Sequence, residues 1–348
     1  MCGWRGKNKA CYNSKMMLQP RLLITMGDVA GIGPEIIARA WAELCALCRP
    51  VVVGDSVWMS RALELVGGKA RIRSIDQPGQ MEASAESIPC LPGSKQKLDG
   101  VKPGRVSAEA GLAAYEFLCT AIDLTMAGEA DAIVTCPLHK EGLRAARLPY
   151  PGHTEILAER TGSHDFGMAL YAKSPDLPLG LAVVHVTLHM GLAEVFGHLS
   201  VKAIFEKIRL LDALMQRLQG GRPRLGVAAL NPHAADGGLF GDEEARLILP
   251  AVRQAQDSGF DVTGPWPSDT LFVRARKGEF DGIVAMYHDQ GHIPMKLLGG
   301  LHAVNISVGL PLVRTSVAHG TAYDIAGKGI ADPASLVEAA RVAAMLVE

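Results

Sequence analysis

The sequence predicts an α/β protein with largely parallel sheets, because short aliphatic segments alternate with segments that begin like helices. The predicted strands are residues 21–25, 51–55, 131–137, 179–186, 224–230, 282–286 and 303–308. Pro34 followed by Glu35 marks a helix start, since proline suits the first helical position and a carboxylate suits the positive end of a helix. Strands that alternate with helices in this way are typical of parallel sheets covered by helices.

Serine residues mark the starts of two further helices. Ser107 is the expected N-cap of a helix of roughly 20 residues, and Ser200 of an amphipathic helix that runs to Gln219. A last helix is expected from Ala334 to the end of the chain. These helices fall between the predicted strands, as the α/β interpretation requires.

The loop after the first strand is rich in glycine, with Gly27, Gly31 and Gly33. Its spacing is neither the dinucleotide fingerprint nor the P-loop, which has a Gly-Lys-Ser/Thr that is missing here. An anion site and a simple tight turn from strand to helix are therefore both open interpretations of this loop.

Composition and length point to a globular protein with small-molecule partners. The chain has 348 residues, which suits two domains, and 48% of them are hydrophobic and 20% charged. The formal net charge is -1, and clustered Lys and Arg residues of the kind that neutralise phosphates are not found, which argues against a nucleic-acid partner. No apolar run approaches the roughly 20 residues of a membrane helix, so no membrane partner is expected.

The cysteines and the N-terminus indicate a cytoplasmic protein. The seven cysteines are odd in number, which favours reduced thiols over a disulfide framework. Cys45 and Cys48 have redox or zinc spacing, but they lie in an apolar helix-like run, and helix packing is the preferred interpretation. Residues 1–20 are expected to be a disordered tail without a signal peptide, with Met16 or Met17 as plausible initiators.

Polar side chains gather directly after the predicted strand 282–286. His288, Asp289, Gln290 and His292 follow this strand, and Lys296 comes eight residues after His288. Open α/β sheets bind ligands at the carboxyl ends of their strands. Imidazole, carboxylate and ammonium groups together suit a metal-bound, anionic substrate.

His189 and His233 also stand after predicted strands, as His288 does. A catalytic divalent metal needs about three protein ligands and an open position, so these three histidines are candidate ligands. Each one alone is more easily a hydrogen-bonded turn residue, and His185 competes with His189 at the same strand end. Asp269 and Asp289 are candidates to fix the tautomers of the ligands. Asp289 has a second interpretation, a place beside Lys296 or a cationic substrate group.

Further residues suit the recognition of anions. Lys296, Asn305 and Arg314 recur at intervals of nine residues, and two cations with an amide fit a phosphate plus a carboxylate. His153 and Thr154 are expected at the donor-rich start of a helix, although His153 could simply cap it. The loop from His319 offers Gly320, beside which a planar ring can approach the backbone.

Several long motifs in the same order resemble the 4-hydroxythreonine-4-phosphate dehydrogenase family. The matching stretches are residues 24–35, 151–155, 231–234, 286–291 and 305–332. The segment 318–329 also looks like the cofactor loop of isocitrate and isopropylmalate dehydrogenases, whose fold that family shares. The resemblance covers the chain from Arg21 to its end.

The resemblance implies a homodimeric oxidoreductase that uses NAD or NADP and one divalent metal ion, Zn, Mg, Mn or Co. It implies two α/β/α domains, residues 21–137 with 303–348 and residues 138–302, with the active site in the cleft between them. The resemblance assigns metal, substrate, catalytic and cofactor roles by position. The metal ligands are His189, His233 and His288; the substrate residues are His153, Thr154, Lys296, Asn305 and Arg314; the catalytic residues are Lys296, Asp289 and Asp269; and the cofactor residues are His319, Gly320, Thr321 and Asp324.

Departures from the family pattern concern the substrate. Members of vitamin B6 (pyridoxine) biosynthesis usually have Pro where this chain has Val29, and Leu where it has His292. With residues 185–189, 239–244 and 296–298, the chain looks more like the branch that acts on D-threonate or D-erythronate 4-phosphate in four-carbon acid catabolism. The enzyme of the terephthalate cis-dihydrodiol also shares the motif around His292.

The expected reaction is oxidation of the C3 hydroxyl of a 4-phosphorylated four-carbon acid, followed by loss of CO2 from the β-keto acid. The alternative within enzymes is oxidation of a non-phosphorylated cis-dihydrodiol dicarboxylate. An alternative from another class is an acyl- or phosphate-transfer protein on a related α/β fold, without a nicotinamide.

Overall fold

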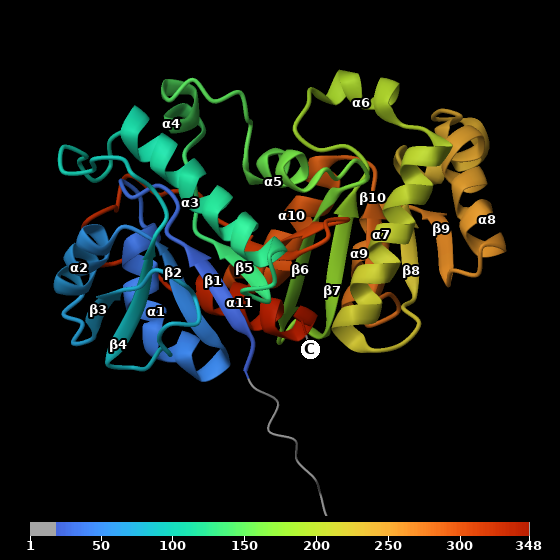
Figure 1. Cartoon of the computed structure of the whole chain (residues 1–348). Coiled ribbons are helices and arrows are strands. Elements are labelled where there is room, and N and C mark those ends of the chain that lie inside the picture. The colour runs from blue at the N-terminus through green and yellow to red at the C-terminus, as the bar shows by residue number, and fades with distance from the viewer. Residues whose placement is uncertain (1–18, 348) are drawn as a thin grey trace, which may run out of the picture.

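The computed structural model describes residues 19–347, and the expectations for residues 1–18 lie outside this part of the chain. A single continuous sheet runs through the molecule, with helices in front of it and behind it (Figure 1). Its strands are β1 (Arg21–Thr25), β2 (Arg49–Gly54), β3 (Arg71–Ser74), β4 (Ser87–Pro92), β5 (Ala132–Thr135), β6 (Gly167–Ser174), β7 (Leu177–His185), β8 (Leu225–Ala228), β9 (Val262–Trp266), β10 (Gly282–Ala285), β11 (Val304–Val308) and β12 (Val313–Val317). Their order is β3-β4-β2-β1-β5-β12-β11-β6-β7-β10-β8-β9.

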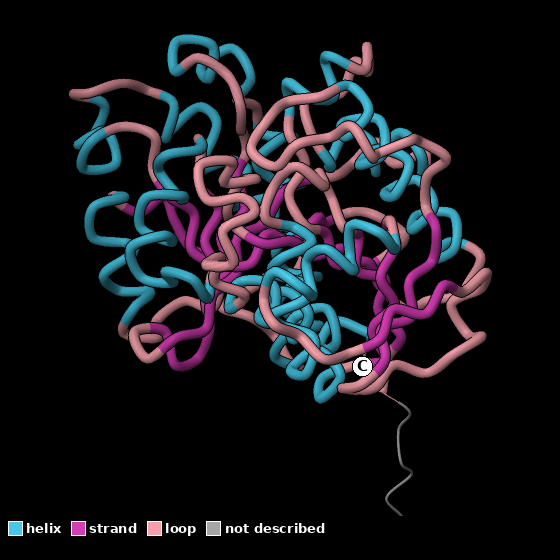
Figure 2. Tube along the Cα trace, turned by 90° about the vertical axis from the view of Figure 1, so that its left-hand side faces the viewer, coloured by secondary structure: helices cyan, strands magenta, loops and turns pink. Residues whose placement is uncertain are grey.

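The helices lie outside the strands, as the view turned by 90° also shows (Figure 2). The α-helices are α1 (Gly33–Leu47), α2 (Ser56–Leu65), α3 (Ala108–Met126), α4 (Lys140–Ala145), α5 (His153–Thr161), α6 (Leu192–His198), α7 (Val201–Gln219), α8 (Leu249–Asp257), α9 (Ser268–Arg276), α10 (His288–Gly299) and α11 (Ala334–Val347). Short 3-10 helices span Pro232–Gly238 and Gly300–His302, and a π-helix spans Glu244–Ile248. None of the helices between residues 19 and 347 is long and apolar enough to cross a membrane.

The sheet is parallel in both halves and antiparallel at its centre. Strands β1 to β5 with β12 pair in parallel, and so do β7, β10, β8 and β9. Strands β12, β11, β6 and β7 pair with antiparallel neighbours. The predicted α/β class with largely parallel sheets is confirmed, while the antiparallel centre was not foreseen.

The predicted domain limits fall between secondary-structure elements. The limit at 137/138 follows β5, and the limit at 302/303 precedes β11. Because β11 pairs with β6 and β12 pairs with β5, the backbone hydrogen bonds of the sheet cross from one half to the other. The division into two domains stays a prediction.

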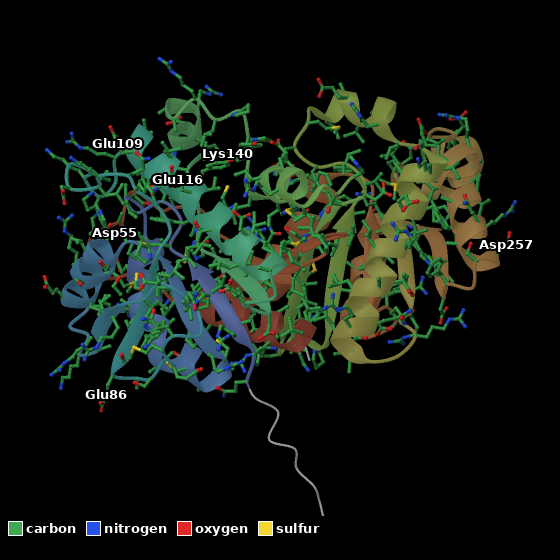
Figure 3. All side chains as sticks on the ribbon, viewed as in Figure 1. Asp55, Glu86, Glu109, Glu116, Lys140 and Asp257 are labelled. Atoms are coloured by element: carbon green, nitrogen blue, oxygen red, sulfur yellow. The ribbon has the colours of Figure 1, made fainter. Side chains whose placement is uncertain are left out.

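Side-chain caps explain where the long helices begin. The Ser107 hydroxyl accepts a hydrogen bond from the Ala110 N–H at 3.0 Å, and the Ser200 hydroxyl accepts one from the Ala203 N–H at 3.1 Å. Each cap satisfies one of the backbone donors that the first turn leaves without a partner. Both predicted helix starts are confirmed. Asp55, labelled in Figure 3, caps α2 in the same way at 2.8 Å.

The glycine-rich loop packs tightly between backbone segments. Gly27 has φ +67, and a Cβ added there would lie 2.3 Å from the Pro137 carbonyl oxygen. At Gly31 a Cβ would come within 2.9 Å of Thr321. The glycines therefore allow this loop to contact both the turn after β5 and the loop after β12, which favours the tight-turn interpretation.

Candidate active site

A cavity of about 610 Å³ opens between the two halves of the sheet. The carboxyl ends of β5 and β12 border it on one side, and those of β7 and β10 border it on the other. Nine of the predicted site residues line its wall: His153, Thr154, His189, His288, Lys296, Asn305, Arg314, His319 and Gly320. Residues separated by more than 160 positions thus meet at one place.

His288 begins α10 at the end of β10 and is oriented by its neighbour. Its Nδ1 lies 2.7 Å from Asp289 Oδ1, which leaves Nε2 for another partner. The ring of His189 lies nearby, with a centroid distance of 5.5 Å. Burial lowers the pKa of His189, so its neutral form, which can bind a metal, is favoured. His189 and His288 therefore place two imidazole groups that can bind a metal in the same wall of the cavity.

His233 does not line this cavity. It lies in the turn Pro232–Gly238, where its φ is 53 and the following residues also have left-handed conformations. The start of the turn is fixed by Glu244, whose carboxylate accepts the backbone N–H groups of Leu230 and Asn231 at 2.8 and 2.7 Å. Within residues 19–347, no group of three or more His, Cys, Asp or Glu side chains is placed to hold a metal ion. One chain therefore brings together two of the three predicted ligands.

His185, the competing candidate, is fully buried at the end of β7. Its Nε2 lies 3.1 Å from His292 Nδ1. Burial lowers the pKa of His185 to about 3, and burial with the nearby His288 lowers that of His292 to about 4. Both rings are thus neutral at pH 7. The His292 ring also stacks on His288, with 3.7 Å between centroids and 12° between planes.

Arg314 on β12 places a buried positive charge in the cavity wall. It is 2% exposed, and its guanidinium donates to the hydroxyls of Thr135, at 3.1 and 2.6 Å, and Ser307, at 3.2 Å. Burial lowers the pKa of Arg314 to about 9, which keeps it cationic at pH 7. Hydroxyl groups fix its orientation without neutralising its charge, so the guanidinium can bind an anion.

Lys140 and Lys207 add to this positive charge and were missed by sequence reasoning. Lys207 projects from the middle of α7, where its Nζ donates to the Phe166 carbonyl at 2.7 Å, and burial lowers its pKa. Lys140, labelled in Figure 3, begins α4. Lys140 follows β5, whose end borders the cavity, so its position after a predicted strand was a signal that could have identified it; Lys207 lies on a helix and had no such signal. Glu155 supplies a carboxylate in the wall.

The start of α5 also faces the cavity. Gly152 is its N-cap residue, and His153 and Thr154 form the first turn, where backbone N–H groups point outward. Burial and the charge of Arg314 lower the pKa of His153 well below its usual value, so the ring is neutral. Asn305 on β11 contributes a buried Oδ1 without a hydrogen-bond partner among the described residues. These groups supply neutral donors and acceptors beside the cations.

The loop after β12 borders the cavity only at its start. His319 and Gly320 line the wall, and the buried Nε2 of His319 has no hydrogen-bond partner among the described residues. Thr321 packs on the glycine-rich loop, where its carbonyl accepts the Ile32 N–H at 3.1 Å. Asp324 is exposed and outside the cavity wall, and so is Asp269 at the start of α9.

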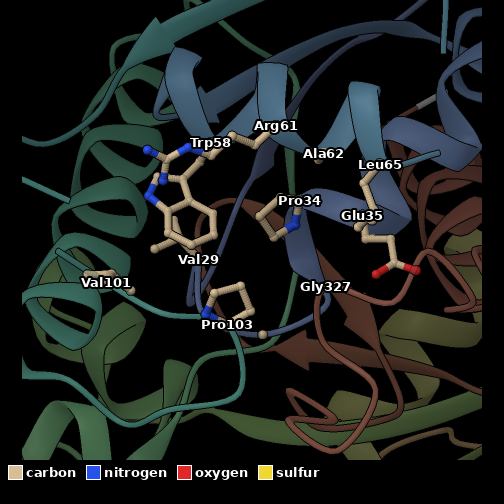
Figure 4. A pocket seen from close by; sticks show the side chains of 11 residues that line it. Val29, Pro34, Glu35, Trp58, Arg61, Ala62, Leu65, Val101, Pro103 and Gly327 are labelled. Carbon is tan, nitrogen blue, oxygen red and sulfur yellow. The ribbon is translucent and has the colours of Figure 1, made fainter. Parts of the chain in front are cut away.

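A second hollow of about 230 Å³ is lined by Val29, Gly31 and Pro34 of the glycine-rich loop and helix start (Figure 4). Trp58 and Arg61 of α2 stand on one side of it, with the guanidinium 5.1 Å from the indole centroid. Glu35 stands on the other side, and its carboxylate accepts the Ala331 N–H at 2.7 Å. Gly327 also lines this hollow. The loop 319–329 therefore borders both hollows.

Proteins of known family are similar to this chain along nearly its whole length. The chain is 46% identical to the D-threonate 4-phosphate dehydrogenase of Cupriavidus necator over 330 residues, which cover 94% of this chain and 97% of that protein. It is also 46% identical to the 4-hydroxythreonine-4-phosphate dehydrogenase of Beijerinckia indica, over 92% of this chain and 93% of that protein.

Solved structures agree with these similarities. A crystal structure of 4-hydroxythreonine-4-phosphate dehydrogenase from Klebsiella pneumoniae has 41% identity and a TM-score of 0.84, covering 94% of this chain and 100% of that one. A terephthalate 1,2-cis-dihydrodiol dehydrogenase from Burkholderia xenovorans is more distant, with 32% identity and a TM-score of 0.64 over 94% of this chain and 98% of that one.

The family model of the pyridoxal phosphate biosynthetic protein PdxA matches residues 46–343. The predicted resemblance to this dehydrogenase family is thereby confirmed. The chain belongs to the PdxA family.

Proposed function

We propose that this protein is an NAD(P)-linked dehydrogenase that oxidises the C3 hydroxyl of a 4-phosphorylated four-carbon acid, with loss of CO2 from the β-keto acid. The observation that carries the proposal is the buried Arg314 guanidinium, held by hydroxyl groups in a cavity that also contains His189 and His288. A fixed cation suits the phosphate, and strand-end imidazoles suit the reacting end of the substrate. The dehydrogenases named among its relatives support this reaction class.

The substrate would be held at both ends by the chain's own groups. Arg314, Lys296 and Asn305 suit a phosphate and a carboxylate, and the first-turn N–H groups at His153 and Thr154 suit phosphate oxygens. Lys296 is the residue we propose for proton transfer, because it is the ammonium on the helix that His288 begins. Asp289 would act by holding His288 Nδ1, and Asp269 stays a proposed catalytic residue that needs a rearrangement to reach the cavity.

We propose His189, His233 and His288 as ligands of one divalent ion, Zn, Mg, Mn or Co. The donor chemistry fits in part, since His189 and His288 share a wall and Asp289 fixes the tautomer of His288. A divalent ion held there would act as a Lewis acid that lowers the pKa of the substrate hydroxyl. His233 lies outside the cavity of its own chain, so it would complete the ligand set only where its turn lies against the cavity of another copy.

A homodimer would account for the position of His233. Leu239 and Phe240, directly after its turn, are 71% and 48% exposed, and Ile293 and Leu297 on α10 are 57% and 79% exposed. Large apolar side chains that share a helix face or a loop in this way suit contact with another protein chain. We propose that a second copy covers them and that His233 serves a cavity at this interface.

The proposed residues for NAD or NADP are His319, Gly320, Thr321 and Asp324. A Cβ at Gly320 would meet no atom within 4 Å, so the backbone there is open to a planar ring. The nicotinamide would accept the hydride released from C3. His319 Nδ1 donates to the Gly320 carbonyl oxygen at 2.9 Å, so Nε2 of the neutral ring would accept a hydrogen bond from the cofactor, and Asp324 is exposed on the same loop.

The acid itself is proposed to be D-threonate 4-phosphate, D-erythronate 4-phosphate or 4-hydroxy-L-threonine 4-phosphate, in a cytoplasmic enzyme. The non-phosphorylated cis-dihydrodiol is not favoured, since the terephthalate enzyme is the more distant relative. The test is a panel of the three 4-phosphates and their unphosphorylated counterparts, with NAD+ and NADP+ and each divalent ion. Formation of reduced cofactor from the 4-phosphates alone is expected. An equal rate without the phosphate would contradict the proposal.

A further inference from the structure

His292 is held in place by three contacts, although the roles proposed above do not use it. It lies one helical turn after His288 on α10, and its Nδ1 is 3.1 Å from His185 Nε2 and 3.3 Å from the His288 carbonyl oxygen. Its ring is also parallel to that of His288, 3.7 Å away. Two hydrogen-bond partners and a stacked ring therefore fix both its position and its rotation.

These contacts determine which ring nitrogen carries the hydrogen. A carbonyl oxygen only accepts hydrogen bonds, so the hydrogen lies on His292 Nδ1 and is shared between the His288 carbonyl and His185 Nε2. His292 Nε2 is then an acceptor, and no described side chain or backbone group donates to it. Because His292 lines the cavity, this acceptor is available to a bound molecule.

His185, the hydrogen-bond partner of His292, can occupy its position because residue 291 is a glycine. A Cβ at Gly291 would lie 2.4 Å from His185 Nε2 and 2.7 Å from Val183 Cγ1, so only glycine allows His185 to stand where it receives the hydrogen bond. His185 is fully buried and cannot turn away into solvent. The pair is preorganised before any ligand binds, which is what a residue that discriminates between ligands needs.

The charges around His292 favour a neutral group over a cationic one. Four cationic side chains line the cavity, Lys140, Lys207, Lys296 and Arg314, against the single carboxylate of Glu155. The phosphate and carboxylate of the substrate would pair with these cations, which leaves Glu155 as the one carboxylate of the described wall for a substrate ammonium, whereas a hydroxyl group needs only an uncharged acceptor. The His292 ring stacks on that of His288, so its acceptor lies beside the proposed metal ligand and can meet the substituent next to the reacting carbon.

We propose that His292 determines substrate specificity: its Nε2 accepts the hydrogen bond of a hydroxyl on C2, and so selects a 2,3-dihydroxy acid 4-phosphate over its 2-amino counterpart. The inference rests on the proposed function and deepens it, because it names the class of acid. The acids that distinguish the two classes are D-threonate or D-erythronate 4-phosphate on one side and 4-hydroxy-L-threonine 4-phosphate on the other.

The experiment compares the wild type with His292→Leu, which removes the acceptor, and His292→Gln, which keeps an acceptor oxygen. His164→Leu is the matched control, since His164 is exposed and outside the cavity. Two quantities are measured for each acid: the Kd by calorimetry without cofactor, and kcat/KM from reduced cofactor. Metal content of each variant is measured in parallel.

In His292→Leu we expect kcat/KM and affinity for the dihydroxy acids to fall about 10- to 100-fold, the usual effect of losing a buried hydrogen bond. The effect on the 2-amino acid should be smaller, so that the wild-type preference shrinks at least about tenfold, with partial recovery in His292→Gln and no change in His164→Leu. Equal losses for both classes, or no loss, would overturn the inference. Selective binding without any reduced cofactor would leave the role of His292 standing and refute the dehydrogenase proposal instead.

Discussion

The Tyr323 hydroxyl donates a hydrogen bond to Oδ2 of the buried Asp28 at 2.7 Å, and so joins two loops that are 295 residues apart in the sequence. The other oxygen of Asp28 accepts the Ala30 N–H at 2.9 Å. The Tyr323 ring stacks on His139, with 4.4 Å between centroids. This contact holds the proposed cofactor loop against the glycine-rich loop.

Tyr323→Phe is predicted to weaken cofactor binding. The variant keeps the stacked ring but leaves Asp28 Oδ2 without its donor, and burial already raises the pKa of that carboxyl. We expect the KM for NAD(P)+ to rise about three- to tenfold, corresponding to about 1 kcal/mol, with little change in the Kd of the substrate acid. Steady-state kinetics with varied cofactor test this. A rise in the substrate Kd with an unchanged cofactor KM would contradict this prediction, because it would show that the contact supports substrate binding and not cofactor binding.

Arg314→Gln is predicted to abolish recognition of the phosphate. It removes the buried charge while the hydroxyls of Thr135 and Ser307 remain. We expect kcat/KM for a 4-phosphate to fall at least about 100-fold, whereas Arg341→Gln, an exposed arginine on α11, should behave as the wild type. Arg314→Lys should recover only part of the loss, because an ammonium cannot replace the planar fork. Full activity in Arg314→Gln would place the phosphate elsewhere.

The metal-free protein is predicted to lose stability in mild acid because of His185. Its pKa of about 3 in the folded chain lies below the ordinary 6.5, so the unfolded chain takes up the proton first as the pH falls. The free energy of unfolding contributed by neutral, buried His185 is fully present above pH 6.5. It falls between pH 6.5 and 3 by about 1.4 kcal/mol per pH unit at most. The free energy of unfolding is measured with urea from pH 8 to 5. It should depend less steeply on pH in His185→Asn than in the wild type, and as steeply as in the wild type in His164→Asn. A wild-type stability that rises toward pH 5 would contradict this assignment.

His233→Ala is predicted to lower bound metal without changing the fold of the chain. His233 is on a turn whose start is fixed by Glu244, so its side chain is not needed for that conformation. Metal analysis and calorimetric titration should show a loss of affinity of at least about tenfold, comparable to that of His189→Ala. Unchanged metal content in His233→Ala with loss in His189→Ala would leave His233 outside the ligand set.

Local signals made much of this architecture predictable. Ser107 and Ser200 act as caps because their hydroxyls reach the donors of the next turn, which is a property of neighbouring residues. His189 and His288 could be placed together because β7 and β10 are parallel neighbours whose ends meet at one edge.

Contacts between segments that are far apart in the sequence could not be predicted from such local signals. The pairing of β11 with β6 and the hydrogen bond between His185 and His292, 107 residues apart, depend on the assembled sheet. Lys207 reaches the cavity from the middle of a helix, where an exposed surface lysine is the ordinary expectation. His233 follows the strand next to β10, but the left-handed turn after β8 takes it out of the cavity.

The proposed dehydrogenase activity is tested directly by the reduction of NAD+ or NADP+ by the metal-loaded protein with D-threonate 4-phosphate, D-erythronate 4-phosphate and 4-hydroxy-L-threonine 4-phosphate. We expect reduced cofactor and an equal amount of CO2 from at least one of them, and no turnover in His288→Ala or Lys296→Ala. Absence of reduced cofactor with all three acids, or full activity in either variant, would contradict it.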